Sequence, residues 1–423
     1  MSTKDQIIAH LDRDYTEPVR DPLWKHIHLS QGMVNLIDSR QFQQLHHIKQ
    51  LGPSYLVYPG ATHSRLSHSL GVFHISRRII RALIGFDSCM ELSQEGVKAF
   101  LCAALLHDVG HFPFAHSLKD LPLKDHEQLT GDVIESAPIR DIIRDRVGAD
   151  PELAAAIVDH SRPDGGSKEV LFFRHILSGT LDPDKLDYLN RDAYFCGVPY
   201  GIQDIDFAIG RMRPHGASGL AMEESGSSAI EHILFSKYLM YRAVYWHRTV
   251  RVATAMIKKA LFLALNERVI RPVDLYGLDD DQFVGRMSGI DFAPFSLISD
   301  VSSRTLHHVV WETPFRDSNP AHAMLMDLEV RSALEDRIAE RIRTRGIEAG
   351  REDVILDIPE HVSFEMTMPV VRDGEVMDYM ESGTVFTRKV IEDFTSTLRR
   401  IRFMVSPGLV DRIPAPEDLL EEL

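Results

Sequence analysis

The residues best suited to chemistry lie between His63 and Glu127, around the pair His107-Asp108. This stretch holds seven of the chain's 21 histidines, a third of them in a short segment. Neutral imidazoles and a carboxylate that converge from separate segments are what a catalytic divalent metal needs, with coordination positions left open for water or substrate. The alternative is a chance cluster of core histidines, each held by hydrogen bonds. The flanking pattern favours a metal site.

An apolar helix has to position this pair. Hydrophobic residues recur at helical spacing just before it, namely Val97, Phe100, Leu101, Ala104 and Leu105. His107 and Asp108 therefore fall where the predicted helix ends, and Gly110 lets the backbone turn. A charged pair at the end of a buried helix is costly unless it is paired or bound to a cation, which again favours a metal.

A second carboxylate comes from the segment 181–197. Asp182 followed by Pro183 predicts a helix start, with an N-cap and a proline at the first helical position. Asp184 then lies in the first turn, where its carboxylate can point toward a metal. Three more side chains share one face beside it and would suit a phosphate, a sugar ring and a sugar hydroxyl, namely Lys185, Tyr188 and Asp192. A surface helix with salt bridges is the alternative for this segment.

The composition is that of an ordinary globular protein. The 423 residues suffice for a large core, and 44% of them are hydrophobic and 26% charged. The net charge of −15 argues against bulk attraction to nucleic acid or to an anionic membrane. Three scattered cysteines make neither a disulfide framework nor a zinc knuckle, so a cytoplasmic location is expected. We expect no signal peptide and no membrane span, because no run of about 18 apolar residues occurs.

The hydrophobic periodicity predicts a mainly α fold. Helix should follow helix from about residue 63 to 205, and one long helix should run from about 228 to 266. Small β-hairpins are expected around residues 215–218 and at Asp373-Gly374, with a final strand at 400–407. Residues 1–20 are expected to form a mobile or loosely docked arm. The C-terminal region should therefore be mixed α/β.

Three long strings resemble HD-domain metal phosphohydrolases, whose signature is H…HD…D. They are IDSRQFQQLHHIKQLGPSYLVYPGATHSRLSHSLGV, LLHDVGHFPFAH and DPDKLDYLNRD. They are most similar to the dNTP triphosphohydrolase branch, which includes bacterial dGTPases and the mammalian SAM-and-HD-domain enzyme. The likeness covers roughly residues 21–260 and implies an HD phosphohydrolase core over 21–262 with a helical fold. The arm at 1–20 precedes this core, and the mixed α/β region at 263–423 would serve oligomerisation or regulation.

The resemblance also implies roles for individual residues. It implies four metal ligands, His68, His107, Asp108 and Asp184. Around the scissile phosphate it implies a second group, with His116 as the expected proton donor, namely His111, His116, His126 and Glu127. Phosphate contacts would come from Arg65, Lys185 and, where the family has an arginine, Lys237. The deoxyribose pocket, in which a tyrosine leaves no room for a 2′-hydroxyl, would be made of Gln50, Leu51, Tyr188, Asp192 and Tyr245.

One position departs from the family pattern. Three residues after His116 the family commonly has an acid, and here Lys119 stands there, with Asp120 next to it. Because a helical residue shifted by one position points about 100° away, we expect Asp120 not to reach His116.

The resemblance implies hydrolysis of a dNTP to the deoxynucleoside and inorganic triphosphate. It implies a divalent metal in the HD site, with Mn, Fe, Zn, Co and Mg all left open, and a Mg²⁺ or Mn²⁺ ion on the substrate triphosphate. Relatives form tetramers or hexamers, so we expect a homo-oligomer and an allosteric nucleotide. Two alternatives stay open. One is another HD-type nucleotidase, phosphodiesterase or alarmone hydrolase, and the other is a nucleic-acid-binding regulatory protein with a vestigial HD site.

Overall fold

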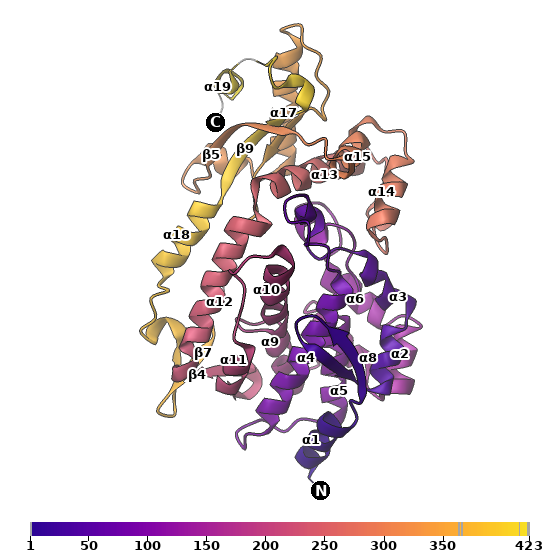
Figure 1. Ribbon diagram of the computed structural model, residues 1–423, viewed down its shortest axis with the longest axis vertical. Coiled ribbons are helices and arrows are strands. Elements are labelled where there is room, and N and C mark those ends of the chain that lie inside the picture. Colours follow the sequence, from indigo (N-terminus) through magenta and orange to yellow (C-terminus); the bar gives the residue numbers. More distant parts are fainter. Residues whose placement is uncertain (1, 363, 365–366, 414, 421–423) are drawn as a thin grey trace.

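A bundle of helices from the first half of the chain forms the lower body of the protein (Figure 1). The computed structural model describes residues 2–362, 364, 367–413 and 415–420. Within the bundle, every residue of α5 from 99 to 106 is apolar and buried, and the helix packs against α4 and α8, so this part of it lies inside. The bundle helices are α4 (Arg65–Ile84), α5 (Gln94–Leu106), α6 (His126–Ile134), α7 (Ile139–Ile142), α8 (Pro151–Val158), α9 (Lys168–Leu177) and α10 (Pro183–Cys196). The mainly α fold predicted from the sequence is confirmed.

The N-terminal residues are part of this body. Helix α1 (Thr3–Arg13) buries Ile7 and Leu11 and packs against α4 and α5. The expectation of a loosely docked arm was therefore wrong, because an amphipathic helix there covers the bundle end. A two-stranded hairpin and two short helices follow, namely β1 (Glu17–Asp21), β2 (Lys25–Leu29), α2 (Gln31–Ile37) and α3 (Arg40–Gln44).

The long helix predicted over 228–266 is divided in two. Helix α12 (Ser227–Met240) passes into a π-helical turn at Tyr241–Tyr245, and α13 (Arg248–Asn266) begins after it. The side chain of His247 caps α13 by accepting a hydrogen bond from the backbone N–H of Thr249. The prediction of a single helix was wrong, because both halves keep the same apolar period across the break. Such π-helical turns are frequent at functional sites.

Two small sheets come from the second half of the chain. The hairpin of β3 (Met212–Pro214) and β4 (Leu220–Glu223) pairs through β4 with a second hairpin. That hairpin is β7 (Pro369–Arg372) and β8 (Glu375–Asp378), which turns at Asp373-Gly374 as predicted. The other sheet has the order β5-β9-β6, with β5 (His308–Pro314), β6 (Val354–Asp357) and the predicted final strand β9 (Arg400–Val405).

The C-terminal region packs on the helical bundle and shares hydrophobic cores with it. Several buried side chains of this region, including Val370, Tyr379 and Phe386, belong to the same hydrophobic core as the bundle. A second core joins α13 to Phe112, Phe283 and Met404, and a third lies under the β5-β9-β6 sheet. The packing therefore does not follow the predicted boundary at 262/263. The remaining helices are α11 (Ile205–Arg211), α14 (Asp280–Ser288), α15 (Ser296–Ser303), α16 (Pro320–Met324), α17 (Leu328–Arg343), α18 (Arg388–Leu398) and α19 (Pro416–Leu419).

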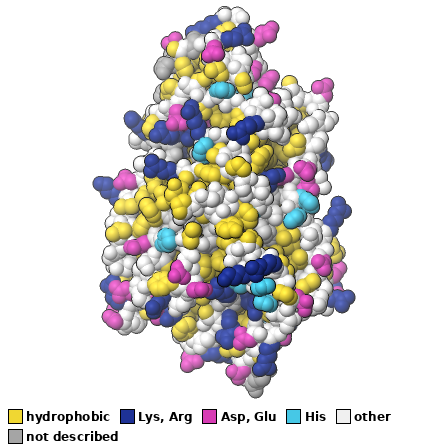
Figure 2. Space-filling model, in the orientation of Figure 1, with side chains coloured by type: hydrophobic (Ala, Val, Ile, Leu, Met, Phe, Trp, Pro, Cys, Tyr) yellow, Lys and Arg dark blue, Asp and Glu magenta, His cyan; other side chains and the backbone are white. Residues whose placement is uncertain are grey.

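The surface carries charges of both signs. On the face shown in Figure 2, Lys and Arg side chains are interspersed with Asp and Glu rather than gathered in one basic stripe. Over the part of the chain that the structure describes, no helix is both long and apolar enough to span a bilayer.

Candidate metal centre and active site

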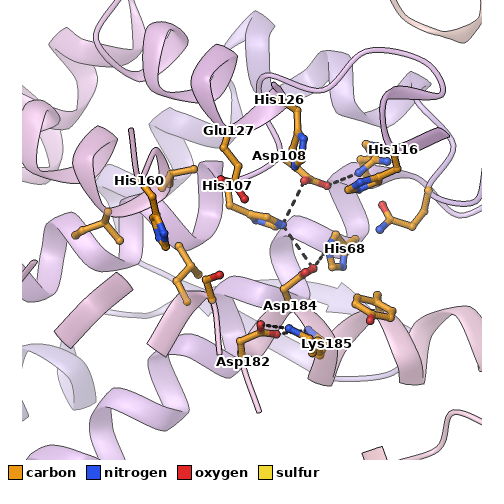
Figure 3. Close-up of a pocket in the computed structure, with 17 residues that line it drawn as sticks. His68, His107, Asp108, His116, His126, Glu127, His160, Asp182, Asp184 and Lys185 are labelled. Carbon is orange, nitrogen blue, oxygen red and sulfur yellow. Dashed lines mark hydrogen bonds and ion pairs between the residues drawn. The ribbon is translucent and has the colours of Figure 1, made fainter. Parts of the chain in front are cut away.

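Four predicted ligands from three elements meet at the centre of the bundle (Figure 3). His68 lies in the first turns of α4, His107 and Asp108 follow the end of α5, and Asp184 lies in the first turn of α10. The Nε2 atom of His68 is 2.9 Å from Oδ1 of Asp184. The Nε2 atom of His107 is 3.5 Å from Oδ1 of Asp108 and 3.9 Å from Oδ1 of Asp184. Ligand atoms of His68, His107 and Asp184 all lie within 4.8 Å of one another, and Asp108 borders this group through His107.

The hydrogen bonds of His107 fit a metal ligand. Its Nδ1 is 3.0 Å from the carbonyl oxygen of Ala104, which can only accept, so Nδ1 carries the proton. Its Nε2 therefore presents a lone pair, and this buried atom has no hydrogen-bond partner among the described residues. A buried lone pair that faces two carboxylates is costly unless a cation lies between them. The donor set, with nitrogen and oxygen ligands, suits a divalent transition metal.

A second layer of groups orients His68. Its Nδ1 is 2.8 Å from Oδ2 of Asp187, and Asp187 in turn accepts hydrogen bonds from Arg191 and from the indole of Trp24. A Cβ at Gly71 would lie 1.8 Å from Oδ1 of Asp187, so only glycine lets α4 and α10 approach this closely. Such carboxylate-histidine pairs fix the ring and raise its basicity. The sequence analysis missed Asp187, although its place on α10, three residues after Asp184, was a usable signal.

The charges around His68 favour a cation. Burial alone would lower the pKa of His68, but the carboxylates of Asp184 and Asp187 raise it to about 10. Burial also opposes ionisation of Asp187, and the guanidinium of Arg191 nevertheless holds the pKa of Asp187 below its usual range. A positive charge, from a proton or a metal, is therefore stabilised at Nε2 of His68.

Arg65 lies behind the centre. Its Nη1 is 2.7 Å from Oδ2 of Asp108, and both side chains are nearly fully buried. Oδ1 of Asp108 is 3.0 Å from Nε2 of His111. Burial raises the pKa of Asp108, but His111, His107 and Arg65 together hold it well below its ordinary value. Arg65, predicted as a phosphate contact, thus already neutralises a predicted ligand, although it still lines the cavity.

Three further histidines form a stacked cluster beside Asp108. The ring centroid of His111 lies 4.1 Å from that of His126 and 4.7 Å from that of His116. The ring centroids of His116 and His126 are 4.9 Å apart. His116 is exposed on the wall of a cavity, but desolvation by the surrounding protein, followed by the charges of neighbouring cationic groups, lowers its pKa. Burial lowers the pKa of His126 to about 4. Burial also raises the pKa of Glu127. The three rings are close enough to hold an ion themselves, and their lowered pKa values keep them neutral near pH 7.

Two joined cavities open onto these groups. The smaller, of about 170 Å³, is lined by the four predicted ligands together with His126, Glu127 and Lys185. The larger, of about 440 Å³, is lined by the residues predicted for the sugar pocket and by Lys237. Residues that line both cavities mark the junction, namely Gln50, Arg65, His116 and Tyr188. Every predicted site residue lines one cavity or both except His111, which lies buried behind Asp108.

Two of the residues predicted for the sugar pocket belong to a hydrogen-bonded chain. The hydroxyl of Tyr245 donates to Oδ2 of Asp192 at 2.7 Å, and Oδ1 of Asp192 is 2.8 Å from Nε2 of His63. Tyr245 belongs to the π-helical turn, and its ring stands edge-on to Tyr188 at 6.3 Å. The sequence analysis missed His63 as a positioning group. It also missed several lining residues that become neighbours only in the fold, including Tyr241, Trp246, Arg251 and Glu360 from the larger cavity and His160 from the smaller.

The acid next to Lys119 is engaged elsewhere. Oδ2 of Asp120 is 2.8 Å from Nζ of Lys258, which also binds Oε1 of Glu360 at 2.8 Å. Among the described residues no hydrogen bond joins His116 to an acid. The expectation that Asp120 does not reach His116 is therefore confirmed.

Two family models match the chain, an HD domain over residues 65–191 and an HD associated region over residues 209–389. The uncharacterized protein YwfO of Bacillus subtilis is 36% identical over 58% of this chain and 55% of its own length. Human deoxynucleoside triphosphate triphosphohydrolase SAMHD1 is 32% identical over 46% of this chain and 35% of its own length. The chain spans about half the length of the curated relatives it matches. A crystal structure of a hypothetical protein from Aquifex aeolicus is 28% identical, with a TM-score of 0.71 over 96% of this chain and 99% of that one.

Proposed function

Because this chain belongs to the HD-domain family of metal-dependent phosphohydrolases, we propose that it hydrolyses dNTPs to deoxynucleosides and inorganic triphosphate. The junction of the two cavities carries the proposal. A cluster of metal-binding groups opens there into a cavity of about 440 Å³, a volume typical of small-molecule sites. The 32% identity to human SAMHD1, a relative named for this reaction, supports the substrate class.

The described residues account for binding and proton transfer. His68, His107, Asp108 and Asp184 would hold a divalent metal, which would supply an activated water and polarise the phosphate that is attacked. Lys185, held at 2.6 Å from Asp182, lines the smaller cavity and lies within reach of phosphate oxygens. His116 stands at the junction, where the negative charge of a bound triphosphate would raise its pKa from its lowered resting value. The protonated His116 then gives its proton to the departing 5′-oxygen.

The larger cavity supports selection of a deoxyribose. Tyr188 and Tyr245 form its wall next to the junction, and Asp192 fixes the hydroxyl of Tyr245. The two rings are packed edge to face, and the hydroxyl of Tyr245 is bonded to the buried Asp192, so Tyr245 cannot yield space for a 2′-hydroxyl without breaking a hydrogen bond. Discrimination between dNTP and NTP should therefore come from shape at Tyr188 and Tyr245.

The test is a panel of the four dNTPs and GTP, singly and in mixtures, with Mn²⁺, Mg²⁺ or Co²⁺. Mixtures are included because the resemblance implies an activating nucleotide, and light scattering on the same samples tests for an oligomer. We expect triphosphate as the only phosphorus product, and Asp108→Ala should abolish it together with the bound metal. Asp145→Ala, an exposed acid far from both cavities, is the matched control. Orthophosphate as the product would instead indicate another HD-type phosphohydrolase. Salt-dependent DNA binding without any hydrolysis would indicate a regulatory protein.

A further inference from the structure

The cations around the two cavities are mostly neutralised by acids of the protein. Lys49 lies 3.1 Å from Asp280, and Arg65 is paired with Asp108. Lys185 is paired with Asp182, and Arg251 with Asp357 and Glu360. These pairs hold the cations in place, but they also cancel much of the positive charge that an incoming polyphosphate would meet.

Lys119 differs from these cations. Its side chain is exposed and lines the larger cavity beside His116 and Ser117. Among the described residues no acidic side chain forms an ion pair with Lys119, and the neighbouring Asp120 is turned away to Lys258. The positive charge of Lys119 nevertheless acts within the site, because it is among the groups that lower the pKa of His116 and His126.

The position of Lys119 is fixed by its surroundings. It ends the 3-10 turn Ala115–Leu118 that carries His116, and Leu118 is fully buried. The pairing of Asp120 with Lys258, which belongs to α13, ties down the other side of this turn. The turn is thus anchored on both sides of Lys119, while no acid in the described part of the chain pairs with the lysine.

We propose that the ammonium group of Lys119 binds an anionic oxygen of the substrate's phosphate chain next to His116. This inference rests on the proposed function and names a further substrate-binding residue for it. A lysine ammonium carries a compact positive charge and three hydrogen-bond donors but no acceptor. An anionic oxygen is therefore the group best suited to replace the water bound to it. A triphosphate carries four negative charges into a chain of net charge −15, and an unneutralised cation at the cavity wall offsets that repulsion. Lys119 thus adds a cation where the resemblance led us to expect an acid.

Three variants test the role of Lys119, namely Lys119→Gln, Lys119→Arg and Lys119→Asp. Two quantities are measured, the KM for the preferred dNTP and the Kd of inorganic tripolyphosphate for the metal-loaded protein. Lys119→Gln should raise both about tenfold or more, as expected for loss of one hydrogen bond between charged groups. Lys119→Arg should restore most of the affinity, and Lys119→Asp should weaken binding further. The affinity for the unphosphorylated deoxynucleoside should stay constant throughout.

Lys168→Gln is the matched control, because Lys168 is an exposed lysine at the start of α9 and lines neither cavity. An unchanged KM and an unchanged tripolyphosphate Kd in Lys119→Gln would overturn the inference while leaving the proposed function intact. If the wild type releases no triphosphate, the proposed function fails instead. The tripolyphosphate Kd still tests Lys119 in that case.

Discussion

Replacing Asp187 by asparagine should weaken metal binding at the candidate centre, although Asp187 is not itself a predicted ligand. Oδ2 of Asp187 accepts hydrogen bonds from Nδ1 of His68 and Nε of Arg191, both at 2.8 Å. Oδ1 accepts from Nη2 of Arg191 at 2.9 Å and from the indole of Trp24. An asparagine has the same shape but one oxygen, so its NH₂ group must face two donors whichever way it turns. The substitution therefore removes two of the four hydrogen bonds and one buried negative charge.

The size of the effect follows from these contacts. Hydrogen bonds to charged groups contribute about 1.5–3 kcal/mol each, and removing one partner of a buried ion pair costs roughly 3–5 kcal/mol. Arg191 keeps Asp21 at 2.8 Å, which limits the loss. We therefore expect Asp187→Asn to lower the free energy of unfolding of the metal-free protein by about 3 kcal/mol. Because His68 loses its orienting acid, metal affinity should also fall by about 10- to 100-fold.

Urea unfolding of the metal-free protein measures the first quantity, and competition with a chelator measures the second. Asp206→Asn is the matched control, because Asp206 is an exposed acid paired with Arg78 on the surface. It should change the free energy of unfolding by no more than about 0.5 kcal/mol. If Asp187→Asn behaves like this control in both assays, the hydrogen bonds of Asp187 do not hold the centre and the reasoning is refuted.

Three further predictions concern the cavities and the charges around them. Tyr245→Ala should raise kcat/KM for GTP relative to dGTP by about tenfold or more, because the cavity gains space beside the sugar; an unchanged ratio would rule out Tyr245 as the selecting group. Burial opposes ionisation of Glu360, but Arg251 and Lys258 lower its pKa from 4.5 to about 2. The carboxylate thus stabilises the fold above pH 4.5 and this stability is lost as the pH falls toward 2. Unfolding free energies of Glu360→Gln should accordingly fall less steeply over that window than those of the wild type, and equal slopes would contradict the assignment. Metal analysis should find one ion per chain, lost in His107→Ala and kept in His126→Ala; two ions in the wild type would mean that the His111, His116 and His126 cluster binds metal as well.

Local sequence signals were enough to place His107, Asp108 and Asp184 at helix ends, whereas His68 came only from the family resemblance. The apolar period before His107 ends where α5 ends, and the Asp182-Pro183 pair begins α10 as expected. Both signals depend on residues within a turn or two, so neighbours in sequence determine them. Long motif strings then joined these local pieces into one site.

Contacts between segments far apart in the sequence could not be predicted from local patterns. The salt bridge from Lys258 to Asp120 joins residues 138 positions apart, and no local pattern marks either partner. The pairing of Arg65 with Asp108 likewise depends on how α4 meets the end of α5. The π-helical turn at Tyr241–Tyr245 escaped prediction because tertiary packing, and not the hydrophobic period, decides where a long helix changes its winding.

Helix α10 connects the metal centre to the sugar pocket. Residues of an α-helix advance about 100° each, so Asp184, Asp187 and Arg191 lie along one stripe, which faces α4. Tyr188 and Asp192 lie on the adjoining stripe, which faces the larger cavity. Because Gly71 lets α4 pack tightly against the first stripe, a shift of α10 that relaxes the centre must also move the second. We therefore expect the occupancy of the candidate metal centre and the shape of the predicted sugar pocket to be coupled through α10, so that substitutions of Asp187 that weaken metal binding also raise the KM for dNTPs.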